Sequence, residues 1–338
     1  MHFAVEQKIV PLVPDLRLDI YRGEEWINAF AADVSAGLTA QPYELLPKYF
    51  YDERGSELFD RITELPEYYP TRTETAILQQ CGTEIIAAAN PTDLVELGSG
   101  SSQKTKLLLE PLLELRGEAC YVPIDVSEAA VRAATVRLVE QYPGLRVHAV
   151  IGDFERHLGG LPDGDARLIA FLGGTIGNFT QDRMLFFLRR LLALCGPDDR
   201  LLIGIDFVKD IDQLEAAYND SQAVTAAFNK NILAAINDNL RGDFDLDAFE
   251  HVAFFDRENS WIEMRLRALR AQTVRIGALD MQVEFAAGDE IRTEISRKFR
   301  RSQFERELKV AGFRLQEWFC DDAARFGLAL IAPAQVRF

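Results

Sequence analysis

The sequence predicts an α/β protein in which a parallel sheet is interrupted by an inserted α+β domain. Between about residues 73 and 207, short apolar runs alternate with helical patterns, as in a parallel sheet with crossover helices. From about 208 to 298 the pattern changes to helices and alternating strands. A helix and a terminal hairpin then close the chain. With 338 residues, 48% of them hydrophobic, the chain is long enough to bury two cores.

The α/β domain is expected to carry five strands before the insertion and two after it. The first five are the apolar runs TDLVELGSG, CYVPIDVS, LRVHAVIGDF, ARLIAFLGG and RLLIGIDFV. Helical patterns follow the first, second and fourth runs, as the connections between parallel strands require. After residue 299, SQFERELKVAG predicts a helix, and FRLQEWFCD with FGLALIAPA predicts an antiparallel hairpin.

The insertion is expected to combine helices with an antiparallel sheet. SQAVTAAFNKNILAAINDNL has apolar residues at four-residue spacing from Val224 to Ile236, which indicates an amphipathic helix. WIEMRLRAL, MQVEF and EIRTEISRKF alternate apolar and polar residues, which indicates strands. We assign residues 73–207 and 299–338 to the α/β domain and residues 208–298 to the second domain. Residues 1–72 join the second domain, because they precede the first sheet strand and show no sheet pattern of their own.

The stretch LPEYYPTRTE, residues 65–74, connects the two predicted domains. Thr71 and Glu74 have the spacing of a capping box, in which the two side chains bond the first free backbone N–H groups of a helix. We therefore expect a helix capped by Thr71, with Pro70 fixing the chain just before it. Tyr69 is expected to pack in the core.

Composition excludes several function classes. The chain has 37 basic and 53 acidic residues, a net charge of −16, so neither nucleic acid nor a membrane surface is an expected partner. Four cysteines without CxxC spacing and four scattered histidines predict no metal site. A signal sequence and an 18-residue apolar run are both absent from the sequence, so we expect a cytoplasmic protein with reduced thiols. Nothing in the sequence indicates an obligate protein partner.

The segment ELGSGSSQKT, residues 96–105, is compatible with three kinds of cofactor turn. A dinucleotide fingerprint and a phosphate-binding P-loop each require a glycine at position 103, where this chain has Gln103. Gly98, Lys104 and Thr105 otherwise fit the P-loop, and Asp206 would resemble its magnesium-binding aspartate. The third alternative is the acidic-x-Gly-x-Gly turn of class I S-adenosylmethionine (SAM) methyltransferases.

Acidic residues after the next two strands favour SAM. Asp125 ends the second strand, where its carboxylate can accept hydrogen bonds from both ribose hydroxyls. Asp153 and Phe154 follow the third strand and suit an adenine, which needs one polar contact and one packing surface. The alternative explanation of Lys104 is a solvated residue on the first helical turn.

Five long segments of the chain are distinctive: KYFYDERGSELFDRITELPEYYPTRTE, LVELGSGSSQKT, FLGGTIGNF, YNDSQAVTAAFNKNIL and RTEISRKF. Together they resemble one family, the SAM-dependent, histidine-specific Nα-methyltransferases of ergothioneine biosynthesis. The resemblance runs from about Tyr43 to the C-terminus. It implies a class I Rossmann-like methyltransferase domain with a separate substrate domain, and trimethylation of the L-histidine α-amine to give hercynine.

The resemblance also implies ligand residues. SAM would contact Gly98, Lys104, Asp125, Asp153 and Phe154. The amino-acid end of histidine would contact Tyr68, Gly173, Asn178 and Tyr218, and its imidazole would contact Glu294 and Ser296, with Met264 lining the pocket.

Asn178 and Tyr51 are the expected catalytic residues. An α-amine titrates near pH 8, so modest desolvation supplies the neutral form and no strong base is required. The amide oxygen of Asn178 can accept from an amine N–H and aim the lone pair, although an asparagine here also suits the cap of the next helix. The rings of Tyr51, Tyr68 and Tyr218 suit the quaternary cation that repeated methylation produces.

Glu294 and Ser296 are two residues apart on a predicted strand, so their side chains share a face. A glutamate and a hydroxyl can serve the two imidazole nitrogens, whereas a salt bridge from Glu294 to Arg292 or Arg297 is the alternative. Glu294 disfavours another amino acid, such as tryptophan or tyrosine, as the substrate. A SAM-binding protein without catalytic activity is the remaining alternative.

Overall fold

The computed structural model describes residues 6–9, 15–21, 23–162 and 164–334, which form two compact units. Unit 1 comprises the described residues of Met1–Tyr21, Pro70–Val208 and Lys298–Phe338, and unit 2 comprises those of Arg22–Tyr69 and Lys209–Arg297.

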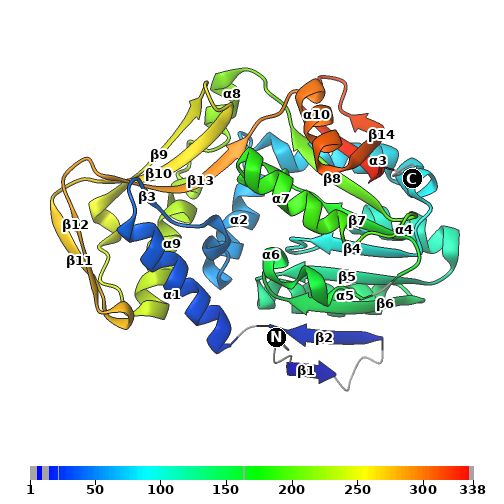
Figure 1. Ribbon diagram of the computed structural model, residues 1–338, viewed down its shortest axis with the longest axis horizontal. Helices are drawn as coiled ribbons and strands as arrows, with labels where there is room; N and C mark the ends of the chain where they lie inside the picture. The colour runs from blue at the N-terminus through cyan, green and yellow to red at the C-terminus, as the bar shows by residue number, and fades with distance from the viewer. Residues whose placement is uncertain (1–5, 10–14, 22, 163, 335–338) are drawn as a thin grey trace. The chain divides into compact units, whose positions relative to one another are not determined.

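Unit 1 is built on a nine-stranded sheet with the order β1-β2-β6-β5-β4-β7-β8-β15-β14 (Figure 1). Its strands are β1 (Glu6–Ile9), β2 (Leu16–Ile20), β4 (Asp93–Leu97), β5 (Ala119–Asp125), β6 (Leu145–Ile151), β7 (Arg167–Phe171), β8 (Arg200–Asp206), β14 (Phe313–Cys320) and β15 (Phe326–Pro333). Neighbours from β2 to β8 in this order are parallel, whereas β15 is antiparallel to β8 and to β14. This is the predicted class I methyltransferase architecture, with its terminal hairpin.

Helices cover both faces of this sheet because successive strand residues are apolar on both sides. Leu94 packs with one face and Val95 with the other. The first face carries α3 (Tyr69–Ala89), α4 (Lys106–Arg116) and α5 (Glu128–Gln141), and the second carries α7 (Gln181–Leu192) and α10 (Arg301–Ala311). Short helices complete the unit: α6 (Phe154–His157), η2 (Leu158–Gly160) and η3 (Thr175–Asn178). From β4 the chain crosses to β5 on one side and later to β7 on the other, so a ligand crevice is expected at the carboxyl ends of these strands.

The N-terminal assignment needs a correction. Residues 1–72 were expected to lie wholly outside the sheet, yet β2 pairs in parallel with β6. Leu16, Leu18 and Ile20 are buried, and the intervening Asp19 is also buried because Arg17 and His148 bond its carboxylate. The short alternating run LRLDI is an added strand of unit 1.

The predicted capping box is also wrong. Helix α3 begins at Tyr69, so Thr71 lies inside its first turn instead of capping it. Proline is tolerated in a first turn, where its missing N–H has no partner to lose, and Pro70 therefore does not delay the helix. Glu74 is left free of any capping role and is fully buried.

Unit 2 combines helices with a four-stranded sheet of order β3-β13-β10-β9. Its strands are β3 (Tyr43–Glu44), β9 (Phe249–Asp256), β10 (Trp261–Ala268) and β13 (Glu290–Arg297), and β11 (Gln272–Ile276) with β12 (Met281–Phe285) forms a separate hairpin. Its helices are α1 (Glu24–Thr39), η1 (Pro47–Phe50), α2 (Glu53–Glu64), α8 (Ile211–Ala216), α9 (Val224–Leu240), η4 (Leu246–Ala248) and η5 (Gly277–Leu279). The sheet is antiparallel except for β3, as predicted for the insertion. Within the described ranges, no helix has the length and apolar character needed to span a bilayer.

Candidate active site

The glycine turn after β4 has the backbone and the polar groups that a cofactor's amino-acid end requires. Gly98 and Gly100 have φ of 73° and 50°, a region that favours glycine. Between them, the Ser99 hydroxyl is buried and has no hydrogen-bond partner among the described residues. An unsatisfied hydroxyl inside a tight turn is costly unless a ligand bonds it, so the turn fits SAM.

Two carboxylates stand where the next two strands end. Asp125, the last residue of β5, accepts hydrogen bonds from the backbone N–H groups of Gly100 and Ser127, both at 2.8 Å. Asp153 caps α6 and accepts from the N–H of Glu155 at 2.8 Å. These bonds fix each side chain at the carboxyl edge of the sheet, where the sequence predicted ribose and adenine contacts.

Phe154 lies beside the glycine turn. Its ring is 3.9 Å from the position that a Cβ on Gly98 would occupy, and it packs edge-on against Phe171 at 5.3 Å between centroids. The ring is therefore held between the glycine turn after β4 and the end of β7. A flat ring in this place suits the packing surface predicted for adenine.

Lys104 is not a solvated residue. Its ammonium forms an ion pair with Glu74 of α3, whose side chain is completely buried. The same carboxylate accepts the backbone N–H of Gly173 at 2.8 Å and 3.0 Å. Gly173 is exposed and has φ of 75°. One buried glutamate thus joins a predicted SAM ligand to a predicted substrate ligand.

A second buried acid lies under the glycine turn. Glu96 of β4 accepts from the hydroxyls of Thr105 and Tyr121, both at 2.5 Å, and Tyr121 is also 2.9 Å from Ser102. Burial raises the pKa of Glu96 to about 7, against the opposing effect of these two hydrogen bonds. Glu96, the acidic residue of the turn motif, therefore anchors the glycine turn through the hydroxyls of Thr105 and Tyr121.

The same contacts argue against a P-loop. Thr105, which would bind magnesium in a P-loop, is 1% exposed and donates its hydroxyl proton to Glu96. Asp206, at the end of β8, forms an ion pair with the buried Lys298 at 2.9 Å. Both side chains that the P-loop alternative needs are engaged inside the protein.

Asn178 ends η3, just beyond the carboxyl end of β7. It does not cap the following helix, because Thr180 is the N-cap of α7 and accepts from Arg183. The Asn178 side chain is half-buried, and none of the described residues forms a hydrogen bond with its amide group. The capping explanation is therefore wrong, and the amide is available to a ligand.

In unit 2, the predicted imidazole ligands share one face of β13 and β10. Met264 is the register partner of Glu294, and Ile262 is that of Ser296. Directly opposite residues of an antiparallel pair project to the same face. Arg292, one partner in the salt-bridge alternative, instead pairs with Glu44 at 3.0 Å.

The three predicted tyrosines of unit 2 are connected by ring contacts. Tyr218 donates its hydroxyl proton to Ser296 at 2.8 Å. The Tyr68 ring lies edge-on to the Tyr218 ring at 6.3 Å, and Phe59 connects Tyr68 to Tyr51 through contacts of 6.2 Å and 5.5 Å. The structure thus brings the three tyrosines and Ser296 into one aromatic cluster.

Tyr69 is packed in the core, as predicted, and its hydroxyl has a partner. The ring is 4% exposed, and Lys209 donates to the hydroxyl at 2.7 Å while lying over the ring at 4.4 Å.

Sequence reasoning missed a neutral network behind Tyr218. His251 lies 2.9 Å from the Tyr218 carbonyl through Nε2, and its Nδ1 lies 2.8 Å from Asn229 Nδ2. Asn229 also donates to the Arg265 carbonyl, and its oxygen accepts from Thr293 at 2.6 Å. The amide nitrogen is thereby fixed as a donor, so His251 accepts at Nδ1 and donates from Nε2. Burial lowers the pKa of His251 below its usual 6.5, which favours this neutral form.

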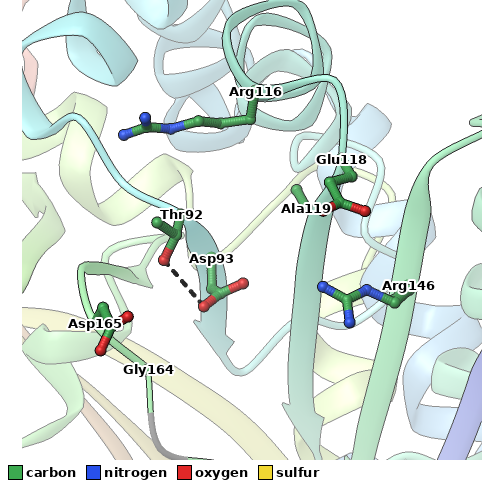
Figure 2. Close-up of a pocket in the computed structure, with 8 residues that line it drawn as sticks. All are labelled: Thr92, Asp93, Arg116, Glu118, Ala119, Arg146, Gly164 and Asp165. Carbon is green, nitrogen blue, oxygen red and sulfur yellow. Dashed lines mark hydrogen bonds between the residues drawn. The ribbon is translucent and has the colours of Figure 1, made fainter.

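A pocket of about 540 Å³ lies at the opposite end of the sheet (Figure 2). It is lined by Thr92, Asp93, Arg116, Glu118, Ala119, Arg146, Gly164 and Asp165. These residues stand at the amino ends of β4 to β7, whereas the predicted SAM ligands stand at the carboxyl ends. The pocket is therefore not the cofactor site.

The chain matches known proteins over most of its length. The family profile described as histidine-specific methyltransferase, SAM-dependent, matches residues 30–333. A histidine N-alpha-methyltransferase of Mycolicibacterium smegmatis is 51% identical over 90% of this chain and 94% of its own length. One from Mycobacterium tuberculosis is 48% identical over 90% and 95%. An ergothioneine biosynthesis protein 1 of Neurospora crassa is 30% identical over 88% of this chain and 34% of its own length.

Proposed function

Since the chain belongs to the histidine-specific, SAM-dependent methyltransferases, we propose that it methylates the α-amine of L-histidine three times, giving hercynine for ergothioneine biosynthesis. SAM supplies an electrophilic methyl group on a sulfonium. The protein's own part is to bind both reactants, to orient the amine and to tolerate a product without N–H groups.

Histidine recognition is the feature that carries the proposal. Glu294 and Ser296 project from one face of β13, with Met264 opposite Glu294 and the Tyr218 hydroxyl on Ser296. A carboxylate and a hydroxyl match the two nitrogens of an imidazole, one as acceptor and one as donor or acceptor. Phenylalanine, whose ring has no N–H, would leave Glu294 without its ligand bond, and such a mismatch costs up to about 10⁴-fold in specificity.

Amine orientation is assigned to Asn178. Its amide oxygen accepts an N–H of the incoming amine, which points the lone pair at the methyl donor without adding a charge. Such orientation is worth up to about 7–11 kcal/mol in favourable cases. Tyr51, Tyr68 and Tyr218 provide ring faces for the quaternary ammonium product, each interaction contributing roughly 0.5–2 kcal/mol.

SAM binding is assigned to unit 1. Ser99, between the two glycines of the turn, offers its hydroxyl to the amino-acid end, and Lys104 offers a cation to the carboxylate. Gly98 allows the backbone to approach this end closely. Asp125 accepts from the ribose, and Asp153 with Phe154 holds the adenine. Unit 2 is accordingly the substrate-binding domain.

Mass spectrometry of L-histidine incubated with SAM and the protein tests this function. We expect products with one, two and three added methyl groups, and accumulation of the trimethylated form. L-tryptophan and L-tyrosine, incubated in parallel, should stay unmethylated. Methylation of either at a rate equal to that of histidine would replace the substrate assignment, and SAM binding without any methylated product would refute the enzyme mechanism.

We also propose that the protein acts in the cytoplasm, with histidine and SAM as its ligands and with no nucleic-acid, membrane or obligate protein partner. All four cysteines are free thiols. Free thiols suit a reducing compartment, and the net charge of −16 opposes binding to phosphate-rich surfaces. Cell fractionation with an antibody against the protein checks the compartment.

A further inference from the structure

We propose that Glu74 is a positioning residue that holds the cofactor-binding Lys104 and the 173–178 turn in one arrangement. This inference rests on the proposed function, since it assigns Lys104 to SAM and Asn178 to the amine. Glu74 contacts neither reactant in this assignment and acts through the groups that it bonds.

The carboxylate of Glu74 bonds two groups, the Lys104 ammonium and the backbone N–H of Gly173. One of its oxygens, Oε2, takes the Lys104 ammonium, and Gly173 donates its N–H across both oxygens. The side chain is 0% exposed, so these protein groups replace water around the charge. A buried carboxylate with several charge-assisted bonds has little freedom to move, and neither do its partners.

The sheet is shaped to admit this carboxylate. A Cβ on Gly204 of β8 would lie 2.4 Å from Glu74 Oε1 and 3.3 Å from the N–H nitrogens of Gly173 and Gly174. Only a glycine at position 204 leaves room for the contact. Gly204 lies in the middle of a buried strand, where the missing side chain has no turn to explain it.

The position of Gly173 affects that of Asn178, because only a short stretch of backbone after β7 separates them. Gly173 and Gly174 both have positive φ, at 75° and 71°, and η3 follows them directly to Asn178. A two-glycine turn has many alternative conformations, so it requires a fixed bond to hold one of them. The bond from Gly173 to Glu74 is such an anchor, five residues before Asn178 at the end of η3.

Glu74→Gln separates the bond to Lys104 from the bond to Gly173, because the amide keeps the shape of the side chain. Its oxygen still accepts from Gly173, but its NH₂ group faces the Lys104 ammonium as a second donor. We expect SAM affinity, measured by calorimetry, to fall about tenfold, the loss of one charge-assisted bond. The kcat at saturating SAM should stay within about threefold of wild type.

Glu74→Ala removes both bonds. We expect the same loss of SAM affinity together with a fall in kcat of about 100-fold, because misplacing a reactant-aiming group by about 1 Å has that effect. Gly204→Ala offers a test that leaves Glu74 and Lys104 in the sequence. Its Cβ should displace the carboxylate and reproduce the Glu74→Ala behaviour.

Asp199→Asn is the matched control. Asp199 is another fully buried carboxylate of unit 1, paired with Arg167 and accepting the backbone N–H groups of Arg167 and Gly196. It precedes β8, at the end of the sheet away from the glycine turn. We expect it to lower the melting temperature without changing SAM affinity or kcat.

Two outcomes would overturn the proposal. Glu74→Gln could bind SAM within twofold of wild type, or Glu74→Ala and Asp199→Asn could lower the melting temperature alike while leaving kcat at saturating SAM unchanged. SAM calorimetry requires no methyl acceptor. If wild type binds SAM but does not methylate histidine, the proposed function fails, and the coupling of Glu74 to SAM affinity is still measured.

Discussion

The two units bury different kinds of polar clusters behind their ligand residues. Unit 1 buries charge: the Glu74–Lys104 ion pair, with the carboxyl group of Glu96 nearby. In unit 2 the cluster behind Tyr218 is neutral: the half-buried His251 and the buried Asn229 and Thr293 exchange single hydrogen bonds. The charged cluster of unit 1 suits the proposed binding of the amino-acid end of SAM, which carries full charges. The neutral cluster of unit 2 suits the positioning of the Tyr218 ring and its hydroxyl.

This difference sets how each unit responds to pH. Glu96 has a raised pKa, so its protonated form is favoured by folding and stability declines as pH rises. His251 has a lowered pKa, so its neutral form is favoured and stability declines as pH falls. The two units therefore respond to pH in opposite directions over overlapping ranges: unit 1 loses stability as pH rises from 4.5 to about 7, and unit 2 loses stability as pH falls below 6.5.

Glu294→Ala should have the largest effect and should be confined to unit 2. Losing the carboxylate that bonds the imidazole is expected to lower kcat/KM for histidine about 10³-fold, as for other buried charged contacts. SAM affinity, which depends on unit 1, should stay within twofold. Steady-state kinetics and SAM calorimetry measure the two quantities.

Glu44→Ala is the matched control for this substitution. Glu44 is also a glutamate of the unit 2 sheet, and it pairs with Arg292 of β13. Its removal should leave kcat/KM for histidine nearly unchanged. Equal losses of histidine and SAM binding in Glu294→Ala would contradict the separation of the two clusters.

Glu96→Gln should remove the pH response of unit 1. The folded-state pKa of about 7 lies above the ordinary 4.5, so wild type loses stability between these values as pH rises. The difference in the free energy of unfolding between Glu96→Gln and wild type should therefore shift by about 3 kcal/mol in favour of the variant from pH 4.5 to pH 8. Urea unfolding at both pH values measures it, and parallel pH curves would show that Glu96 does not titrate as stated.

Asn178→Ala should act on turnover. Without the amide oxygen the amine is no longer aimed, and we expect kcat to fall about 100-fold, with SAM affinity and the melting temperature unchanged. Asn178→Asp restores an acceptor and should recover part of the rate. Activity near wild type in Asn178→Ala would exclude the proposed role in orienting the amine.

Much of the fold and of the candidate site could be predicted from the sequence, because the patterns that mark them span only a few neighbouring residues. The glycine turn and the acids after β5 and β6 follow from strand ends, since parallel strands bring their carboxyl ends to one edge. Glu294 and Ser296 share a face because of the two-residue period of a strand. Their roles as ligands stay predictions.

The missed features depend on partners that are distant in sequence. Glu74 bonds groups 30 and 99 residues away, while its three-residue spacing from Thr71 mimics a capping box. His251 bonds groups 22 and 33 residues away, and no periodic pattern marks it. Strand β2 carries two charged residues, and the burial of Asp19 depends on His148, which is 129 positions further along the chain.

His251→Gln should give the smallest effect, visible only in acid. Glutamine can accept from Asn229 and donate to the Tyr218 carbonyl, so histidine KM near pH 7.5 should match wild type. Once the pH falls to its lowered pKa, wild type protonates His251 Nδ1, which then opposes the amide donor of Asn229 and loosens Tyr218.

The KM ratio of wild type to His251→Gln is the quantity to measure, because titration of the substrate itself cancels in the ratio. It should rise as pH falls from 7.5 to 5.5, with a slope no steeper than one proton, about tenfold per pH unit. His148→Gln is the control, since His148 bonds Asp19 at the β2 edge of unit 1. A flat ratio for His251→Gln, or an equal rise for His148→Gln, would mean that acid acts on histidine binding through groups other than the network behind Tyr218.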